Sequence, residues 1–160
     1  MHRRESLGEK LNHVCHAILN LAQKFHDIHF VLPVHPNPKV KSTLFHILAH
    51  HERVHLIEPM KYDAFIHLMQ NSFFIMSDSG GVQEEAPYLE KPVLVFREHS
   101  ERLTGLDLGL AKLTGTQEKD IYDAMLNLIS SKDDYQTMIQ ADSKPYGDGT
   151  AAAKIVDTIL

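Results

Sequence analysis

The sequence predicts an α/β protein in which a mainly parallel sheet is flanked by helices. Short apolar runs rich in β-forming residues alternate with longer segments whose apolar residues recur at helical spacing. The predicted strands are apolar almost throughout, which is typical of strands buried on both faces of a parallel sheet. The segments after the strands are rich in polar, proline and glycine residues. In such sheets ligands bind outside the carboxyl ends of the strands, so we expect the site there.

The first half of the chain predicts three helices and three strands. Apolar residues at helical spacing predict a long amphipathic helix from about residue 5 to 26, and no strand is predicted before it. A short apolar run over 28–34 predicts a buried strand, which the prolines of the following segment end. The same reasoning predicts, in order, a helix over 40–48, a strand over 54–57, a helix over 62–69 and a strand over 73–77.

The second half continues the alternation after a pair of glycines. It predicts a helix over 82–89, a strand over 92–96, a weak strand over 110–113, a helix over 121–129 and a helical tail over 150–160. Ser131 is predicted to cap a further helix, with Asp134 at the third helical position. The alternation extends along the whole chain, without repeats or linkers.

Length and composition narrow the class of protein. A chain of 160 residues predicts one domain, 1–160, that is large enough to bury a core. The net charge of −5 argues against a nucleic-acid partner, because affinity for phosphate backbones comes from clustered Lys and Arg. Cys15 falls on the apolar face of its helix, which predicts a buried, inert thiol. No apolar run approaches the roughly 18 residues that span a bilayer, and the N-terminus lacks a signal-peptide pattern, so we expect a cytoplasmic protein without a membrane partner.

One stretch matches a zinc signature by its letters. His51-Glu52-Arg53-Val54-His55 has the spacing HExxH, which binds metal only on a continuous helix. Here a strand is predicted to begin at Val54, so the two histidines should diverge. We therefore predict no metal site.

The turn after the third predicted strand is the strongest candidate for a ligand site. Ser79, Gly80 and Gly81 lie between an apolar run and a helix, where backbone N–H groups can receive a phosphate. Glu84 and Glu85 follow a turn later, where a carboxylate can accept hydrogen bonds from a ribose. The alternative is a plain strand-to-helix turn followed by a solvated first helical turn.

Other candidates lie near the ends of predicted elements. His2, Arg3 and Arg4 precede a helix, where they form either an anion site or a cluster of charges in a first turn. His35 directly follows a strand, at the edge where ligands bind. Phe65 could stack on a base, but it is also a candidate core aromatic.

Taken together, several segments resemble the non-hydrolysing UDP-N-acetylglucosamine 2-epimerases. The resemblance runs in family order over essentially the whole chain. It is carried by His2–Gly8, Pro33–Pro38, Tyr62 with Phe65, Ser77–Pro87, Gly115-Thr116 and Pro145–Gly149. The family has two Rossmann-like domains arranged as in GT-B glycosyltransferases, with the nucleotide sugar between them. The resemblance implies that this chain is the second domain, beginning after the strand that precedes His2.

The resemblance also implies a reaction and a role for each site residue. Family members interconvert UDP-N-acetylglucosamine and UDP-N-acetylmannosamine, a step toward cell-envelope polysaccharides, by eliminating UDP and adding it back. By position, His2 would be the catalytic residue at the reaction centre. The implied UDP contacts are Phe65 at the uracil, Ser79, Gly80 and Gly81 at the pyrophosphate, Glu85 at the ribose and Arg102 beside the phosphate charge. Arg3 and His35 match positions that contact a second, activating UDP-N-acetylglucosamine in bacterial members.

No metal or other cofactor is implied. Family members are homodimers, while a chain of this length could be monomeric. The family's acid/base carboxylates lie in the first domain, so we expect this chain to be inactive alone and to need a separate N-terminal-domain polypeptide. The family's Glu-Arg-Pro-Glu is also changed here to Glu101-Arg102-Leu103-Thr104. Two alternatives remain: a non-catalytic module that binds nucleotide sugars, and the donor domain of a GT-B glycosyltransferase.

Overall fold

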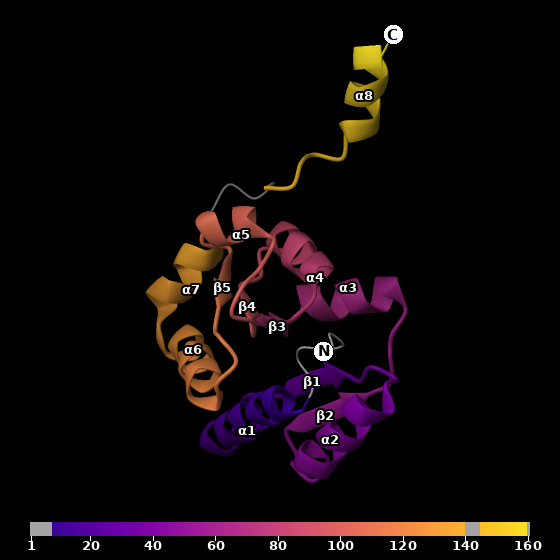
Figure 1. Ribbon diagram of the computed structural model, residues 1–160. Coiled ribbons are helices and arrows are strands. Elements are labelled where there is room, and N and C mark those ends of the chain that lie inside the picture. Colours follow the sequence, from indigo (N-terminus) through magenta and orange to yellow (C-terminus); the bar gives the residue numbers. More distant parts are fainter. Residues whose placement is uncertain (1–7, 140–144, 160) are drawn as a thin grey trace.

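Parallel strands form the centre of the molecule, in two groups (Figure 1). The structure is a computed structural model and describes residues 8–139 and 145–159. In one group β1 (Phe30–Pro33) pairs with β2 (Val54–Ile57). In the other, β4 (Val93–Val95) lies between β3 (Ile75–Ser77) and β5 (Ala111–Leu113). Every one of these pairings is parallel, as the sequence predicts.

Helices connect and cover the strands. They are α1 (Glu9–Lys24), α2 (Pro38–Leu48), α3 (Tyr62–Gln70), α4 (Gly80–Glu85), the 3-10 helix η2 (Ala86–Leu89), α5 (Leu103–Asp107), α6 (Glu118–Ser130), α7 (Lys132–Ile139) and α8 (Ala151–Ile159). Two of the helix starts have clear local causes. Asn37 accepts a hydrogen bond from the N–H of Lys39 at 3.0 Å, with Pro38 at the first helical position of α2. Ser131 accepts one from the N–H of Asp134 at 3.1 Å, which confirms the predicted cap of α7.

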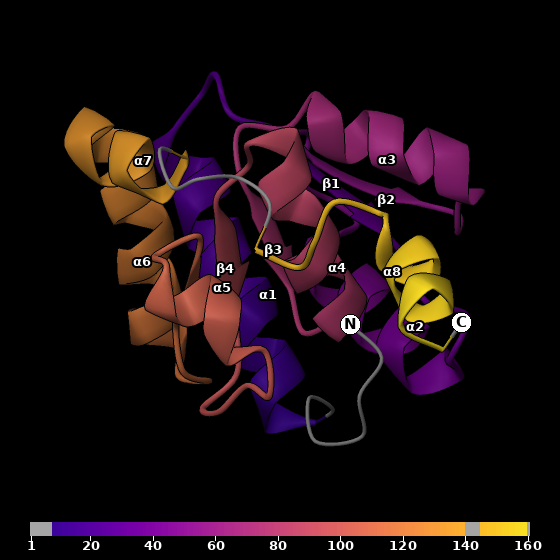
Figure 2. The same cartoon turned by 90° about the horizontal axis from the view of Figure 1, so that it is seen from above.

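Strand β4 shows that helices lie on both faces of the strands. Leu94 and Phe96 belong to the larger core cluster, together with side chains of α1 and α6. Val93 and Val95 point to the opposite face, where they pack with residues of η2 and β5. Figures 1 and 2 show α1 and α6 on one side of these strands and α4 and α5 on the other. This alternation explains why the strand is apolar throughout.

Helix α1 is the main helix of the larger core. It packs against α6 and α2, and the side chains on its inner face are buried. Cys15 lies among them, fully buried, which confirms the predicted inert thiol. Desolvation by burial raises the pKa of this thiol from 9.0 to about 12, so almost none of it is thiolate at neutral pH.

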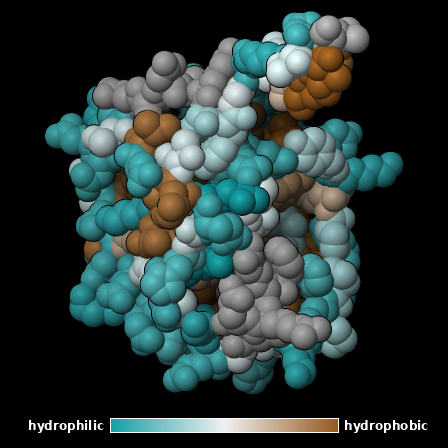
Figure 3. Space-filling model, turned by 45° about the horizontal axis from the view of Figure 1, so that its top comes forward, coloured by the Kyte–Doolittle hydropathy of each residue, from teal (hydrophilic) through white to brown (hydrophobic). Residues whose placement is uncertain are grey.

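Helix α8 differs from the others because none of its described residues is buried. It projects from the rest of the chain (Figure 1), and its apolar residues Ile155, Val156 and Ile159 are exposed. An apolar patch near the top of Figure 3 lies over this part of the chain. The adjoining segment is attached to the body through Tyr146, whose hydroxyl accepts the N–H of Gly105 at 3.1 Å.

Most elements lie where the sequence predicts them, with two differences. The predicted helix over 82–89 begins earlier, at Gly80, and is divided in two. Its second part, which contains Pro87, is the 3-10 helix η2. Helix α5 is not predicted, since five residues that include a glycine are too short to show a helical period.

The HExxH stretch lacks the helix that this motif requires. Helix α2 ends at Leu48 and β2 begins at Val54, so His51 lies in the loop between them while His55 lies on β2. Among the described residues there is no group of three or more potential metal ligands. No helix in the described parts of the chain is long and apolar enough to cross a membrane.

Candidate functional site

The turn between β3 and α4 is the centre of the candidate site. Within this turn, the N–H of Ser79 donates a hydrogen bond to Oγ of Ser77 at 3.0 Å. Ser79 then has extended backbone angles (φ −81°, ψ 130°) as the residue before the helix, and within the described structure its hydroxyl makes no capping bond to α4. The N–H groups of Gly80 and Gly81 follow at the first helical positions. Hydroxyl and amides are therefore presented together at the carboxyl end of β3.

Arg102 brings a positive charge directly to this turn. A Cβ atom built on Gly80 would lie 3.5 Å from Nε and 3.6 Å from Nη2 of Arg102, so the guanidinium rests against the glycine at ordinary contact distance. The same construction on Gly81 meets, within the described structure, only Oγ of Ser79, at 3.8 Å. Gly80 thus faces the arginine, while Gly81 is exposed toward solvent.

The two adjacent glutamates of α4 have different partners. Glu84 forms an ion pair with Nε of Arg102. Glu85 accepts a hydrogen bond from the hydroxyl of Tyr62, on α3, at 3.1 Å. Consecutive helical residues point about 100° apart, so the two carboxylates cannot share one partner. Glu85 faces α3, on which Phe65 lies half-buried one turn beyond Tyr62.

The bond between Tyr62 and Glu85 changes how the tyrosine ionises. Hydrogen bonding to the Glu85 carboxylate, followed by desolvation and by the charge of that carboxylate, raises the pKa of Tyr62 above 10.0. Tyr62 itself is exposed and Glu85 is half-buried, so this bond lies at the surface. A ligand that takes over the carboxylate would replace this exposed bond.

A second strand-end loop lies after β5. Thr116 donates its hydroxyl to Glu98 at 3.0 Å, and Lys10 of α1 lies 3.7 Å from the same carboxylate oxygen. The Thr116 bond and then the Lys10 charge lower the pKa of Glu98. Glu98 is therefore ionised at neutral pH and is a poor candidate for a general acid.

Of the remaining predicted residues, His35 is the one that the structure describes. His35 lies at the end of β1, in the other strand group, where its Nδ1 accepts the N–H of Asn37 at 3.2 Å. His2 and Arg3 fall outside the described residues. The structure therefore brings together Ser79, Gly80, Gly81, Glu85 and Arg102, with Phe65 on the neighbouring helix, while His35 follows a strand of the other group.

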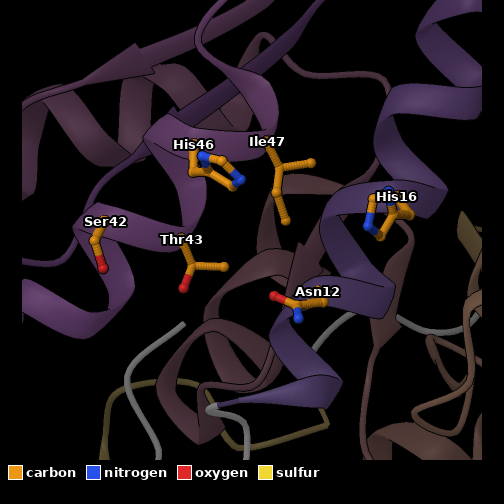
Figure 4. Close-up of a pocket in the computed structure, with 6 residues that line it drawn as sticks. All are labelled: Asn12, His16, Ser42, Thr43, His46 and Ile47. Carbon is orange, nitrogen blue, oxygen red and sulfur yellow. The ribbon is translucent and has the colours of Figure 1, made fainter.

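Two open hollows on the surface lie elsewhere. One, of about 630 Å³, lies between α1 and α2, and Figure 4 shows the side chains that line it: Asn12, His16, Ser42, Thr43, His46 and Ile47. The other, of about 480 Å³, is lined by Asn20, Glu118, Lys119 and Tyr122. Neither set includes a residue that the sequence predicts for the site, and most of the side chains around the first hollow are exposed.

Two residues of this arrangement are not predicted from the sequence, and a third has a partner that the sequence does not indicate. The sequence offers Glu84 and Glu85 alike as carboxylates for a ribose, and the structure pairs Glu84 with Arg102. Gln83 and Ser100 were assigned no role, although they are hydrogen-bonded to each other. The sequence gives little sign of this role, because Gln83 is a polar residue beside Glu84 and nothing in the local pattern indicates that it is buried.

The parallel strands covered by helices on both faces are those of a Rossmann-like α/β domain, with its candidate site at the strand ends. The chain belongs to the UDP-N-acetylglucosamine 2-epimerase family, whose model matches residues 1–160.

Relatives and solved structures agree with this assignment. The UDP-N-acetylglucosamine 2-epimerase of Bacillus subtilis (strain 168) is 46% identical over 159 residues, which is 99% of this chain and 42% of the relative. A UDP co-structure of S. aureus MnaA aligns with a TM-score of 0.94 and 42% identity over 99% of this chain and 43% of that one. UDP-GlcNAc 2-epimerase from Neisseria meningitidis bound to UDP-GlcNAc aligns with a TM-score of 0.94 and 43% identity, with the same coverage. The chain thus spans about 42% of the length of such relatives.

Proposed function

We propose that residues 1–160 form a single UDP-binding domain, the nucleotide-binding half of a UDP-N-acetylglucosamine 2-epimerase. One observation carries this proposal: two structures described with UDP or UDP-GlcNAc bound align with 99% of the chain at a TM-score of 0.94. Family membership and the clustering of the predicted contact residues support it. We place the protein in the cytoplasm, in keeping with its single, buried cysteine.

The UDP contacts follow from the arrangement of the side chains. The pyrophosphate would lie at Ser79, Gly80 and Gly81, with the guanidinium of Arg102 beside it to offset its charge. Glu85 would release the Tyr62 hydroxyl and accept hydrogen bonds from the ribose. Phe65, on α3, would face the uracil.

In the proposed reaction, UDP leaves C1 of the sugar as C2 loses its proton, and returns after C2 has inverted. His2 would lie at the reaction centre, whereas Arg3 and His35 would contact a second, activating UDP-N-acetylglucosamine. The chain's own contribution is to bind and orient the nucleotide and to stabilise the departing diphosphate. The carboxylates that move the proton would come from an N-terminal-domain polypeptide. No metal is needed for these steps.

Replacing Gly81 tests the nucleotide site. A Cβ at this position meets nothing closer than 3.8 Å among the described atoms, so Gly81→Val should fold. Its branched side chain would nevertheless occupy the space through which a phosphate approaches the backbone. We expect calorimetry to show UDP binding by the wild type and at least about tenfold weaker binding by Gly81→Val.

Gly81→Ala is the matched control and should lose less affinity, because it adds a single methyl group. Equal UDP affinity in the wild type and Gly81→Val would contradict the proposed pyrophosphate position. A wild-type chain that does not bind UDP at all would contradict the proposal as a whole.

A mixing experiment tests catalysis. We expect this chain alone to convert UDP-N-acetylglucosamine negligibly when the reaction is followed by NMR, because it lacks a partner that closes the site and excludes water. Adding a separately produced N-terminal domain of the Bacillus subtilis relative should restore conversion. Robust turnover by the chain alone would contradict the proposed division of roles. Failure to restore it would favour a non-catalytic binding module, and sugar transfer to an acceptor would favour a GT-B donor domain.

A further inference from the structure

Gln83 is a buried polar residue that the proposed UDP contacts do not use. Its side chain is 1% exposed, on the inner side of α4. A buried amide is costly unless its polar atoms are paired, and here both ends are. Nε2 donates to the carbonyl of Ser79 at 3.2 Å, while Oε1 accepts the hydroxyl of Ser100 at 2.7 Å.

The hydrogen bonds continue from Ser100 to Arg102. The Ser100 hydroxyl gives its single proton to Gln83 and accepts the N–H of Arg102 at 3.1 Å. The orientation of the amide is fixed by these partners, because a flipped amide would place its oxygen against the Ser79 carbonyl. A continuous path therefore runs from the backbone of Ser79, through Gln83 and Ser100, to the backbone of Arg102.

The neighbouring Glu84 holds the other end of Arg102. Its carboxylate pairs with the guanidinium, while Gln83 acts on the backbone through Ser100. Two consecutive residues of α4 thus hold both ends of the arginine that rests against Gly80. The helix that begins at the candidate phosphate turn also determines where the arginine lies.

We propose that Gln83 is a positioning residue, which acts through Ser100 to hold Arg102 at its place beside the Ser79–Gly81 turn. This inference rests on the proposed UDP site for its functional consequence. The required chemistry is specific to an amide. A carboxylate could not donate to the Ser79 carbonyl, and an apolar side chain would leave the Ser100 hydroxyl without its acceptor, whereas the Ser79 carbonyl would keep the backbone N–H of Gln83.

The first test needs no ligand. In Gln83→Met, which keeps the length of the side chain without its hydrogen bonds, amide hydrogen exchange at Arg102 should rise about tenfold, although Gln83 does not touch that N–H. The matched control is Ser131→Ala, because Ser131 accepts the N–H of Asp134 at 3.1 Å in the same way but far along the chain. It should leave exchange at Arg102 unchanged. Unchanged exchange at Arg102 in Gln83→Met would overturn the proposal.

The second test uses UDP affinity in a double-mutant cycle. Gln83→Met should weaken UDP binding about tenfold in the wild type but less than about threefold when Arg102 is already alanine, because the two residues act as a unit. Ser100→Ala should behave like Gln83→Met, whereas Ser100→Thr, which keeps the hydroxyl, should bind as the wild type does. An equal loss in both backgrounds would show that Gln83 acts by another route and would overturn the proposal.

The outcomes separate the two claims. If the wild type binds no UDP, the proposed function fails, and the positioning role is then decided by exchange at Arg102 alone. If UDP binds but the cycle is additive, the function stands and the role of Gln83 fails. Should Gln83→Met not fold, Ser100→Ala cuts the same path and replaces it in the cycle.

Discussion

Arg102 is held in place although the two residues that follow it differ from those of the Glu-Arg-Pro-Glu motif. Leu103 and Thr104 stand where the resemblance leads one to expect proline and glutamate. Leu103 is 60% exposed, at the first position of α5, and does not anchor the turn. The arginine is instead held from α4, by Glu84 at its side chain and through Ser100 at its backbone. Its place beside Gly80 therefore depends on contacts distant in sequence.

The bond between Tyr62 and Glu85 gives a prediction for ionisation. Because this carboxylate raises the pKa of Tyr62, Glu85→Gln should lower that pKa toward 10.0. A spectrophotometric titration of phenolate formation would show the change, with Tyr62→Phe identifying the signal. The raised pKa also means that the bond contributes stability at pH values below about 10.0, which is lost as the pH rises through the folded-state pKa.

Tyr135 is the internal control for this titration. Burial, rather than a carboxylate, raises its pKa, so Glu85→Gln should leave its titration unchanged. If Tyr62 titrates identically in the wild type and Glu85→Gln, the hydrogen bond to Glu85 does not persist in solution.

Strand β4 is the element that joins the two helical layers to the sheet. Its middle residue, Leu94, is fully buried in the larger core with α1 and α6, while its neighbours on either side pack against η2 and β5. The strand is also paired on both edges. Although β4 is short, it is therefore hydrogen-bonded on both edges and packed on both faces.

Truncating Leu94 should therefore be costly. We expect Leu94→Ala to reduce the free energy of unfolding by about 3 kcal/mol, because the surrounding side chains can collapse into the cavity only in part. Urea denaturation measures this loss. Leu103→Ala removes the same atoms from an exposed site and should change stability by less than about 0.5 kcal/mol. A similar cost for both variants would mean that β4 is not packed as described.

The order and type of the elements could be predicted largely from the sequence, but their ends could not. Apolar periodicity identifies which side α1 buries, and an apolar run identifies β4, because burial selects those residues directly. Ends depend instead on individual hydrogen bonds. Pro87 illustrates this: it divides a predicted helix, and Glu90, with φ of 55°, ends the 3-10 turn that follows.

The candidate site was predicted in part for a related reason. The glycine turn is local, so its place after β3 follows from the neighbouring strand pattern. The partners of α4 are not local: Tyr62 is 23 residues from Glu85, and Ser100 is 17 residues from Gln83. Which carboxylate faces the arginine depends on the rotation of α4 against these loops, and the sequence alone does not contain that angle.

At the scale of the whole chain, the parallel strand pairing has a consequence for how the protein folds. Paired strands β1 and β2, β3 and β4, and β4 and β5 are each joined by a helical crossover rather than a tight turn. No described pair can therefore form as a local hairpin, and each pairing must first close a loop that contains a helix. Non-local contacts of this kind slow folding. We expect helices to form before the strands meet, leaving apolar strand edges exposed for longer than in a helical bundle of the same length, so that refolding yield should fall as the protein concentration rises.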